Sequence, residues 1–417
     1  MRIGYLHLGP PDHGVPRLGR ILAAEARKRP SLSVIEAAAS LTGNWQEDRS
    51  TIIAAAHHLA DSDVVHLQYN SQRDGSVWGR GWRQLHNFRL FARVCRRPLV
   101  VQVSDFYPKY PPATLLLQAP QQIRGIVRAA GRRLWRSSRS PTGPSLRPSV
   151  FVKEVKSSLG PVGSTVRWLA RRSRLMIVCS EEEQRRVSAF VEGAPIRMIF
   201  LFAEERRLPL GMTEAKSLLG LSGRRVLTLL GFVHPRKGHK LLLQALAELP
   251  ADFVVVFAGR AREEQTKQDV LAFARDHGVE HRVRLTDYLS EEELEHYLAA
   301  TDLAVCPFQT AAASSSINTW ISAARPILAS DMPLIAEYNR LAPGAIRTFS
   351  PYTADALSHA IRDMIEVGGD SLSGIGRLRE RLTISRIFDE HLDAYRQALS
   401  NRPESGFDVQ RVTAVSR

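Results

Sequence analysis

Short apolar runs alternate with longer amphipathic stretches along most of the chain. An apolar run of this length, bounded by turn residues, is typical of a buried parallel strand, and the stretches between the runs have helical periodicity. Such alternation predicts a parallel sheet with helices on both of its faces. The runs of the first half lie at Met1–Leu8, Asp63–Tyr69, Pro98–Ser104, Leu175–Ser180 and Ile196–Phe202.

The second half repeats the same pattern, so the 417 residues predict two α/β domains rather than one. A short helix and loops at Glu204–Ser222 predict the linker between them, and Ile384–Leu399 predicts a strongly amphipathic final helix. The strands of the second half are predicted at Val226–Leu230, Phe253–Ala258, Val283–Leu285, Leu303–Pro307 and Pro326–Ala329.

Composition narrows the class of protein. The chain is 44% hydrophobic, which supports real cores, but it has no long uncharged apolar run that predicts a membrane-spanning helix. Its first residues predict a strand and lack the features of a signal peptide. The three cysteines lie far apart in apolar contexts, which predicts free thiols in a reducing cytosol and neither a zinc site nor a disulfide framework.

The net charge of +15 is concentrated in one segment. Residues 121–175 hold thirteen Arg or Lys and a single acid, Glu154. A helix is predicted at Gln121–Ser138, with a basic stripe opposite its apolar face, and such a helix is typical of a membrane-surface element. Docking of the apolar face on its own domain is an alternative, and nucleic acid is a weaker one because no aromatic residues interleave the arginines. The stripe consists of Arg124, Arg128, Arg132 and Arg136.

A basic loop follows the first strand of the second half. The sequence VLTLLGFVHPRKGHK, from Val226 to Lys240, reads as a strand, Gly231, a loop with Arg236 and Lys237, and a helix start. In parallel sheets such loops lie at the carboxyl edge, where ligands bind, and a lysine beside helix N–H groups suits a phosphate. An ordinary turn with a solvated lysine fits this loop equally well when it is judged alone.

The order of segments resembles glycosyltransferase family 4, also called the group 1 transferases. GFVHPRKGHKLLLQAL resembles the family's glycine–lysine loop and helix, FVVVFAGR resembles the next strand, and RLTDYLSEEELEHYLAATDLAVCPF resembles the base-pocket loop with its flanking elements. SSSINTWISAARPILASDMPLIAEY resembles the nucleotide-sugar segment. The resemblance is good over Val226–Tyr338 and looser in the first half.

The resemblance implies a GT-B fold: two Rossmann-like domains facing a cleft, with the last helix crossing back to the N-terminal domain. The expected organisation is an acceptor domain at 1–205 with a basic insertion at about 111–170, a linker at 206–222, a nucleotide-sugar domain at 223–380, a crossover helix at 381–400 and a disordered tail at 401–417.

The resemblance also implies site residues. Lys237 and Arg236 are expected to stabilise the diphosphate, and Asp105 is a candidate acceptor contact, although a loop-capping aspartate is equally compatible. No metal or cofactor is expected, since GT-B enzymes generally work without a bound metal and no Asp-x-Asp triplet occurs. The expected donor-binding residues are Gly14, Gly231, Lys237, Gly259, Tyr288, Leu289, Ser314, Ser315, Ser316 and Thr319.

The sequence departs from the family pattern at four positions. Ala311 and Thr319 stand where the family usually has two glutamates, Phe232 replaces an arginine, and Ser104 replaces a histidine. The implied function is retaining transfer from a UDP- or GDP-sugar to a lipid-linked, polysaccharide or other envelope acceptor. The enzyme would be cytoplasmic or peripheral at the inner membrane face, with no nucleic-acid partner. The missing carboxylates favour an alternative, a non-catalytic GT-B protein that binds a nucleotide or sugar.

Overall fold

The computed structural model describes residues 1–417 except 11–13, 71–75, 105–114, 116–147, 262, 312, 367–370 and 401–417. The predicted basic helix at Gln121–Ser138, Asp105 and the predicted tail lie outside the described residues. The chain forms two compact units. Unit 1 comprises Met1–Ile177, Arg186–Arg197 and Phe388–Arg417, and unit 2 comprises Val178–Arg185 and Met198–Ile387.

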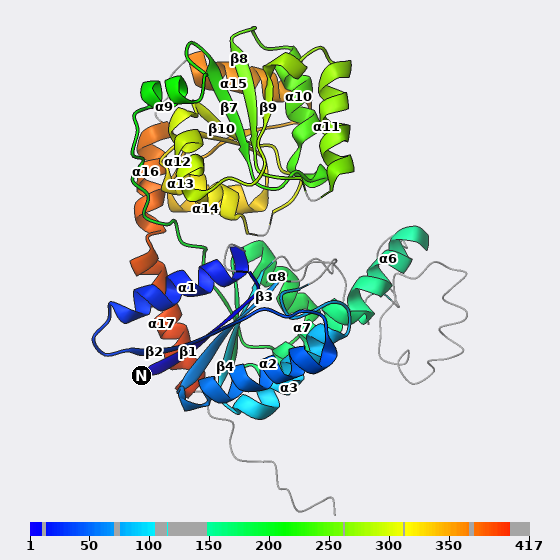
Figure 1. Ribbon diagram of the computed structural model, residues 1–417, viewed down its shortest axis with the longest axis vertical. Coiled ribbons are helices and arrows are strands. Elements are labelled where there is room, and N and C mark those ends of the chain that lie inside the picture. Colours follow the sequence, from blue (N-terminus) through cyan, green and yellow to red (C-terminus); the bar gives the residue numbers. More distant parts are fainter. Residues whose placement is uncertain are drawn as a thin grey trace, which may run out of the picture. The chain divides into compact units, whose positions relative to one another are not determined.

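Unit 1 contains a six-stranded sheet with the order β2-β1-β3-β4-β5-β6. Neighbouring strands from β2 to β5 pair in parallel. Strands β1 and β3 are buried along almost their whole length, because helices flank the sheet (Figure 1). The strands are β1 Arg2–Leu8, β2 Ser33–Ala39, β3 Val64–Asn70, β4 Leu99–Ser104, β5 Leu175–Val178 and β6 Ile196–Met198. The helices are α1 Gly14–Arg27, α2 Trp45–His58, α3 Arg83–Cys95, α6 Pro148–Leu159 and α7 Pro161–Arg172. The helix α8, Glu181–Phe190, begins in unit 2 and ends in unit 1.

The last helix, α17 (Ile384–Ser400), begins in unit 2 and continues in unit 1. Its Tyr395 is fully buried, and the Tyr395 hydroxyl lies 3.2 Å from the Tyr5 hydroxyl and 3.0 Å from His66 Nδ1. Burial raises the pKa of Tyr395 and lowers the pKa of His66, so both side chains are neutral at pH 7. These contacts attach α17 to the strands β1 and β3, and the predicted crossover helix is confirmed.

Unit 2 contains a second six-stranded parallel sheet, with the order β12-β11-β10-β7-β8-β9. The prediction of two Rossmann-like domains is therefore confirmed. The strands are β7 Arg225–Leu230, β8 Phe253–Ala258, β9 Val283–Leu285, β10 Leu303–Cys306, β11 Ile327–Ser330 and β12 Arg347–Phe349. The helices are α9 Met212–Leu218, α10 His239–Ala247, α11 Glu264–Asp276, α12 Glu291–Ala300, α13 Ser315–Ser322, α14 Pro333–Leu341, α15 Ala354–Glu366 and α16 Ser371–Arg381.

Three internal contacts of unit 2 fix its helices. Ser290 and Glu293 form a reciprocal capping box at the start of α12. The buried Glu337 carboxylate accepts the backbone N–H groups of Glu181 and Glu182, at 2.8 and 3.0 Å, and so caps α8. The buried Asn318 amide donates to the backbone carbonyls of Leu201 and Phe202. Among the described residues, no helix is both long and apolar enough to cross a bilayer.

Candidate functional site

The winding of unit 2 changes direction between two neighbouring strands. The chain proceeds from β7 to β8 and β9 on one side, then returns to β10, β11 and β12 on the other. The change of direction falls between β7 and β10, which pair in parallel. In open α/β sheets, ligands bind at such a switch point, outside the carboxyl ends of the strands.

The loop after β7 is held tightly against the neighbouring strands. Gly231 has φ +112° and donates its N–H to the carbonyl of Ala258, at 2.9 Å. His234 Nδ1 accepts the N–H of Arg236 at the start of a single 3₁₀ turn, Pro235–Lys237. Gly238 then takes φ +77°, and a Cβ there would lie 2.2 Å from the Pro307 carbonyl oxygen. Only glycine fits this close approach, which fixes the position of Lys237.

Lys237 joins the ends of both strands at the switch point. Its Nζ donates to Ser316 Oγ, at 2.9 Å, and lies 3.8 Å from the centroid of the Phe308 ring. A Cβ on Gly231 would lie 3.0 Å from Ser316 Oγ and 3.4 Å from Lys237 Nζ. The ammonium, a hydroxyl and a bare stretch of backbone therefore converge in one place.

The helix α13 begins at this cluster and presents its N-terminal end to it. Ser314 is the N-cap and its buried hydroxyl accepts the N–H of Ile317, at 3.3 Å. This capping bond uses one serine of the run, Ser315 is exposed, and Ser316 contacts Lys237. The partial positive charge of a helix N-terminus and a nearby ammonium both attract anions.

The groups buried around Lys237 are held neutral. Burial, together with the smaller effect of the charge of Lys237, lowers the pKa of His239 to about 3. Burial raises the pKa of the Cys306 thiol to about 12, although Lys237 opposes this shift. At pH 7 the imidazole and the thiol are uncharged, so neither neutralises the ammonium.

A second group of side chains lies where β8 and β9 end. Gly259 follows β8, donates its N–H to Thr286 Oγ1 at 2.9 Å, and approaches Gly231 so closely that a Cβ would lie 2.5 Å from the Gly231 carbonyl oxygen. The next guanidinium, Arg260, lies 5.7 Å from the Phe232 ring and 5.8 Å from the Tyr288 ring. Both rings are exposed, at 40% and 53%. Planar, cationic and aromatic surfaces of this kind can stack on a nucleobase.

The structure brings together only some of the residues predicted from the sequence. Gly231, Lys237, Ser316 and Gly259 form one cluster with the N-terminus of α13. The remaining predicted residues occupy other environments. Arg236 is exposed and its carbonyl accepts the N–H of Gln309, Leu289 packs against the core beside Val226, and Tyr288 faces Arg260. The Thr319 hydroxyl donates to the Ser315 carbonyl, Gly14 begins α1 in unit 1, and Ala311, at a position where the family usually has a glutamate, is half-buried.

Three residues of the cluster were not predicted: Phe308, Arg260 and His239. Arg260 directly follows the glycine of the FVVVFAGR segment, and that position was its only signal in the sequence. Asp105 and the arginines 124, 128, 132 and 136 lie outside the described residues, so their predicted roles stay predictions.

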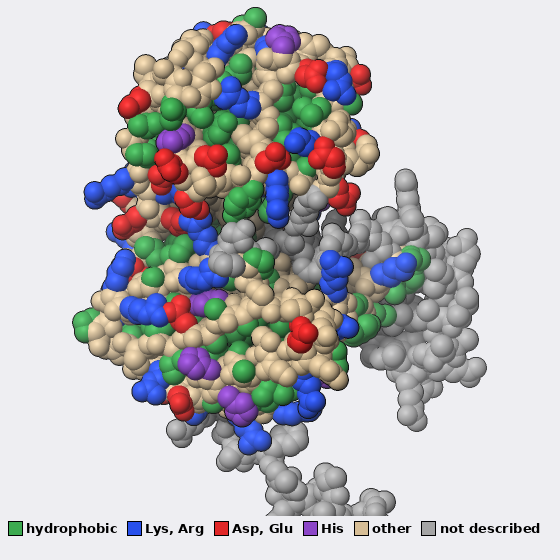
Figure 2. Space-filling model, viewed as in Figure 1, with side chains coloured by type: hydrophobic (Ala, Val, Ile, Leu, Met, Phe, Trp, Pro, Cys, Tyr) green, Lys and Arg blue, Asp and Glu red, His purple; other side chains and the backbone are tan. Residues whose placement is uncertain are grey.

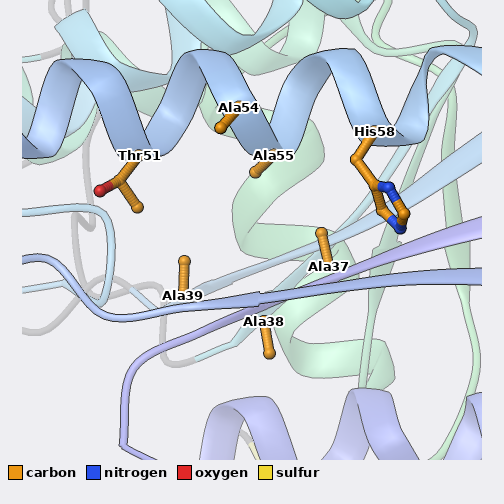
Figure 3. Close-up of a pocket in the computed structure, with 7 residues that line it drawn as sticks. All are labelled: Ala37, Ala38, Ala39, Thr51, Ala54, Ala55 and His58. Atoms are coloured by element: carbon orange, nitrogen blue, oxygen red, sulfur yellow. The ribbon is translucent and has the colours of Figure 1, made fainter.

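A pocket in unit 1 has a different character (Figure 3). It lies between the edge strand β2 and the helix α2, where Ala37 and Ala39 face Ala55 and His58. Its walls are mainly alanine methyl groups, with one hydroxyl and one imidazole. This pocket lacks the cations and the helix N-terminus that mark the switch point of unit 2.

Comparisons with known proteins agree with this geometry. Residues 213–381 match the family model for glycosyl transferases group 1. No curated protein matched the chain. Among solved structures, Anabaena Alr3699/HepE in complex with UDP and glucose is 14% identical, with a TM-score of 0.65 over 94% of this chain and 99% of that one.

Two further structures show the same fold. Sucrose-phosphate synthase from Thermosynechococcus elongatus is 14% identical, with a TM-score of 0.66 over 96% of this chain and 100% of that one. WaaG, a glycosyltransferase involved in lipopolysaccharide biosynthesis, is 14% identical, with a TM-score of 0.56 over 95% and 99% of the two chains. The predicted GT-B fold is confirmed, and the match over residues 213–381 confirms the predicted resemblance to the group 1 glycosyltransferases in this part of the chain.

Proposed function

We propose that the chain transfers a sugar from a UDP- or GDP-linked donor to a lipid-linked, polysaccharide or other envelope acceptor. The observation that supports the proposal is the contact of Lys237 Nζ with Ser316 Oγ, at 2.9 Å, at the switch point between β7 and β10. An ammonium, a hydroxyl and the N-terminus of α13 match the charge and the acceptor oxygens of a diphosphate.

The neighbouring groups suit the rest of a nucleotide-sugar. Arg260, between the Phe232 and Tyr288 rings, offers a stacking surface for the base. Gly231 and Gly259 leave backbone exposed where a side chain would exclude the ligand. Alr3699/HepE structures contain UDP or UDP-glucose, and this supports a donor of the same class here.

The chemistry requires stabilisation of a leaving group. As the glycosidic bond breaks, the departing diphosphate gains negative charge, and preorganised donors that meet this charge lower the barrier. We assign this role to Lys237, helped by Ser316, the N-terminus of α13 and Arg236. Transfer with retention and without a metal follows the family resemblance, and Asp105 and Gly14 are the proposed contacts from unit 1.

A second function is supported by one observation. Ala311 and Thr319 are neutral where the family usually has glutamates, and the Thr319 hydroxyl is engaged by the Ser315 carbonyl, at 2.9 Å. A protein with an intact diphosphate site and altered neighbouring positions could bind a nucleotide-sugar without transferring it.

The substitution Lys237→Ala tests the first function. We expect donor hydrolysis to fall about 10²–10³-fold, the range measured for removal of one preorganised donor. Lys240→Ala is the matched control, because Lys240 is an exposed lysine three residues away whose ammonium lies 5.1 Å from the Phe273 ring centroid. Wild-type turnover by Lys237→Ala would refute the assignment.

Calorimetry with UDP-glucose and GDP-mannose separates the two functions. A transferase binds one of these donors and hydrolyses or transfers its sugar. Donor binding by the wild-type chain without turnover, across lipid-linked and polysaccharide acceptors, would favour the binding protein.

We also propose that the chain associates with the inner face of a membrane, because residues 121–175 carry a large excess of positive charge.

A further inference from the structure

The outer side of the helices α2 and α3 in unit 1 carries a second basic surface, distinct from residues 121–175. Residues 80–104 contain six arginines and neither Asp nor Glu. On α3 the exposed side chains follow one stripe, through Trp82, His86, Arg89 and Arg93. No described carboxylate forms an ion pair with any of these arginines. Arginines spaced at i and i+4 repel one another, so the surface favours an external anion.

The helix α2 contributes to the same surface. The Trp45 ring packs edge-on against His86, with 4.4 Å between ring centroids. Besides partial burial, the charges of Arg93, Arg89 and Arg49 lower the pKa of His86, which places guanidinium groups of both helices around one imidazole. A depression in the surface here is lined by Trp45 and Ile53 together with Gln46, Arg49 and Ser50. Blue and purple side chains occur around the region where Figure 1 places α2 and α3, with tan surface and acidic side chains among them (Figure 2).

Two tryptophans are exposed in the part of the chain that the structure describes, and both lie at one end of this surface. Trp45 is the first residue of α2 and is 39% exposed, and Trp82 is the N-cap of α3 and is 58% exposed. Because β2, β3 and β4 are parallel, the helices that connect them both begin at the carboxyl edge of the sheet. The indoles therefore lie at the edge where α/β sheets bind ligands, and the arginines extend away from it.

We propose that this surface, formed by Trp45, Arg49, Trp82, His86, Arg89 and Arg93, docks unit 1 on an anionic lipid bilayer. Tryptophan prefers the membrane–water interface, and arginines near an anionic leaflet add electrostatic attraction. A single-stranded nucleic acid would instead require aromatic rings spread among the cations, with bases stacked along them. Docking in this orientation would bring the ligand-binding edge of unit 1 to the membrane, where a lipid-linked acceptor lies. Only this last step rests on the proposed function.

Flotation of the full chain with vesicles tests the proposal. We expect binding to vesicles of phosphatidylglycerol and phosphatidylcholine in equal parts, weakened by high salt, and little binding to phosphatidylcholine alone. The double substitution Arg89→Gln/Arg93→Gln should weaken partitioning onto the vesicles about 25-fold, because each arginine is expected to contribute about fivefold. Arg377→Gln/Arg381→Gln on α16 is the matched control, because these exposed arginines have the same spacing and lie in unit 2. Trp82→Ala should also weaken partitioning.

Two results would overturn the proposal. The first is wild-type partitioning by Arg89→Gln/Arg93→Gln, which would assign any vesicle binding to another part of the chain. The second is binding of single-stranded DNA, lost in the same variant, without binding to vesicles. Donor hydrolysis is measured separately and without lipid, and it should be unchanged in these variants. Loss of vesicle binding with intact hydrolysis, or the reverse, therefore distinguishes a failure of this inference from a failure of the proposed function.

Discussion

Replacing Gly231 by alanine should have two effects that can be measured separately, one on the stability of unit 2 and one on donor binding at the diphosphate site. Gly231 has φ +112°, a backbone conformation that residues with a side chain rarely adopt. Strain of this kind costs about 1–3 kcal/mol. In a domain of this size, each kcal/mol lowers Tm by about 2–4 °C.

The added methyl group would also collide with the site. Its carbon would lie 3.0 Å from Ser316 Oγ and 3.4 Å from Lys237 Nζ, so one of these side chains must move. The bond between them is a hydrogen bond to a charged group, and such bonds contribute about 1.5–3 kcal/mol. If these atoms hold the donor, loss of that arrangement weakens donor binding by about 10–100-fold.

Gly223→Ala provides the control, because Gly223 has φ +71° and no atom lies within 4 Å of an added Cβ. It should lower Tm by strain alone and leave the Kd for UDP-glucose unchanged. Thermal denaturation and calorimetry measure the two effects in both variants. If Gly231→Ala bound the donor as tightly as the wild type, Lys237 and Ser316 would not form the donor site.

Two further predictions concern the stability of unit 2. The pKa of His239 in the folded state, about 3, lies below the unfolded value of about 6.5. The contribution of neutral His239 to the free energy of unfolding is therefore complete above pH 6.5 and is lost as pH falls towards 3, by about 1.4 kcal/mol per pH unit. Urea denaturation at pH 7 and pH 5 should show this loss, and an equal loss in His239→Gln would contradict it. Glu337→Ala removes the acceptor of two backbone N–H groups of α8 and should cost about 1.5–3 kcal/mol in urea denaturation, against a smaller loss for Glu337→Gln; an unchanged midpoint would refute the capping role.

The fold was predictable where burial on both faces makes a strand apolar throughout. The predicted strands at Phe253–Ala258 and Val283–Leu285 have the observed bounds of β8 and β9. The predicted strand at Ile196–Phe202 is too long, since β6 ends at Met198 and the Ala203 N–H bonds to the Leu382 carbonyl instead. β12, at Arg347–Phe349, was missed because its first two residues are exposed and it has no apolar run.

The site was predictable only in the part that is contiguous in sequence. The loop from Gly231 to Lys237 has a local signature, but its contacts with Phe308 and Ser316 depend on β10 lying beside β7. Strand order follows from how the chain winds, and neither periodicity nor composition encodes it locally. The position of Arg260 between Phe232 and Tyr288 depends in the same way on the neighbouring ends of β7, β8 and β9.

The neutral residue at Thr319 bears directly on the choice between transfer and binding. Thr319 lies three residues after Ser316 on α13, so a glutamate there would place a negative charge within one helical turn of the Lys237 contact. Because Thr319 has an uncharged hydroxyl in place of that glutamate, the site attracts any diphosphate more strongly, whether in the donor or in the released nucleotide. Uniform strengthening of this kind does not speed a chemical step, because only contacts that tighten in the transition state do so. Lys237→Ala should therefore lower turnover more than donor affinity if the chain transfers sugar, whereas in a binding protein it would lower donor affinity alone.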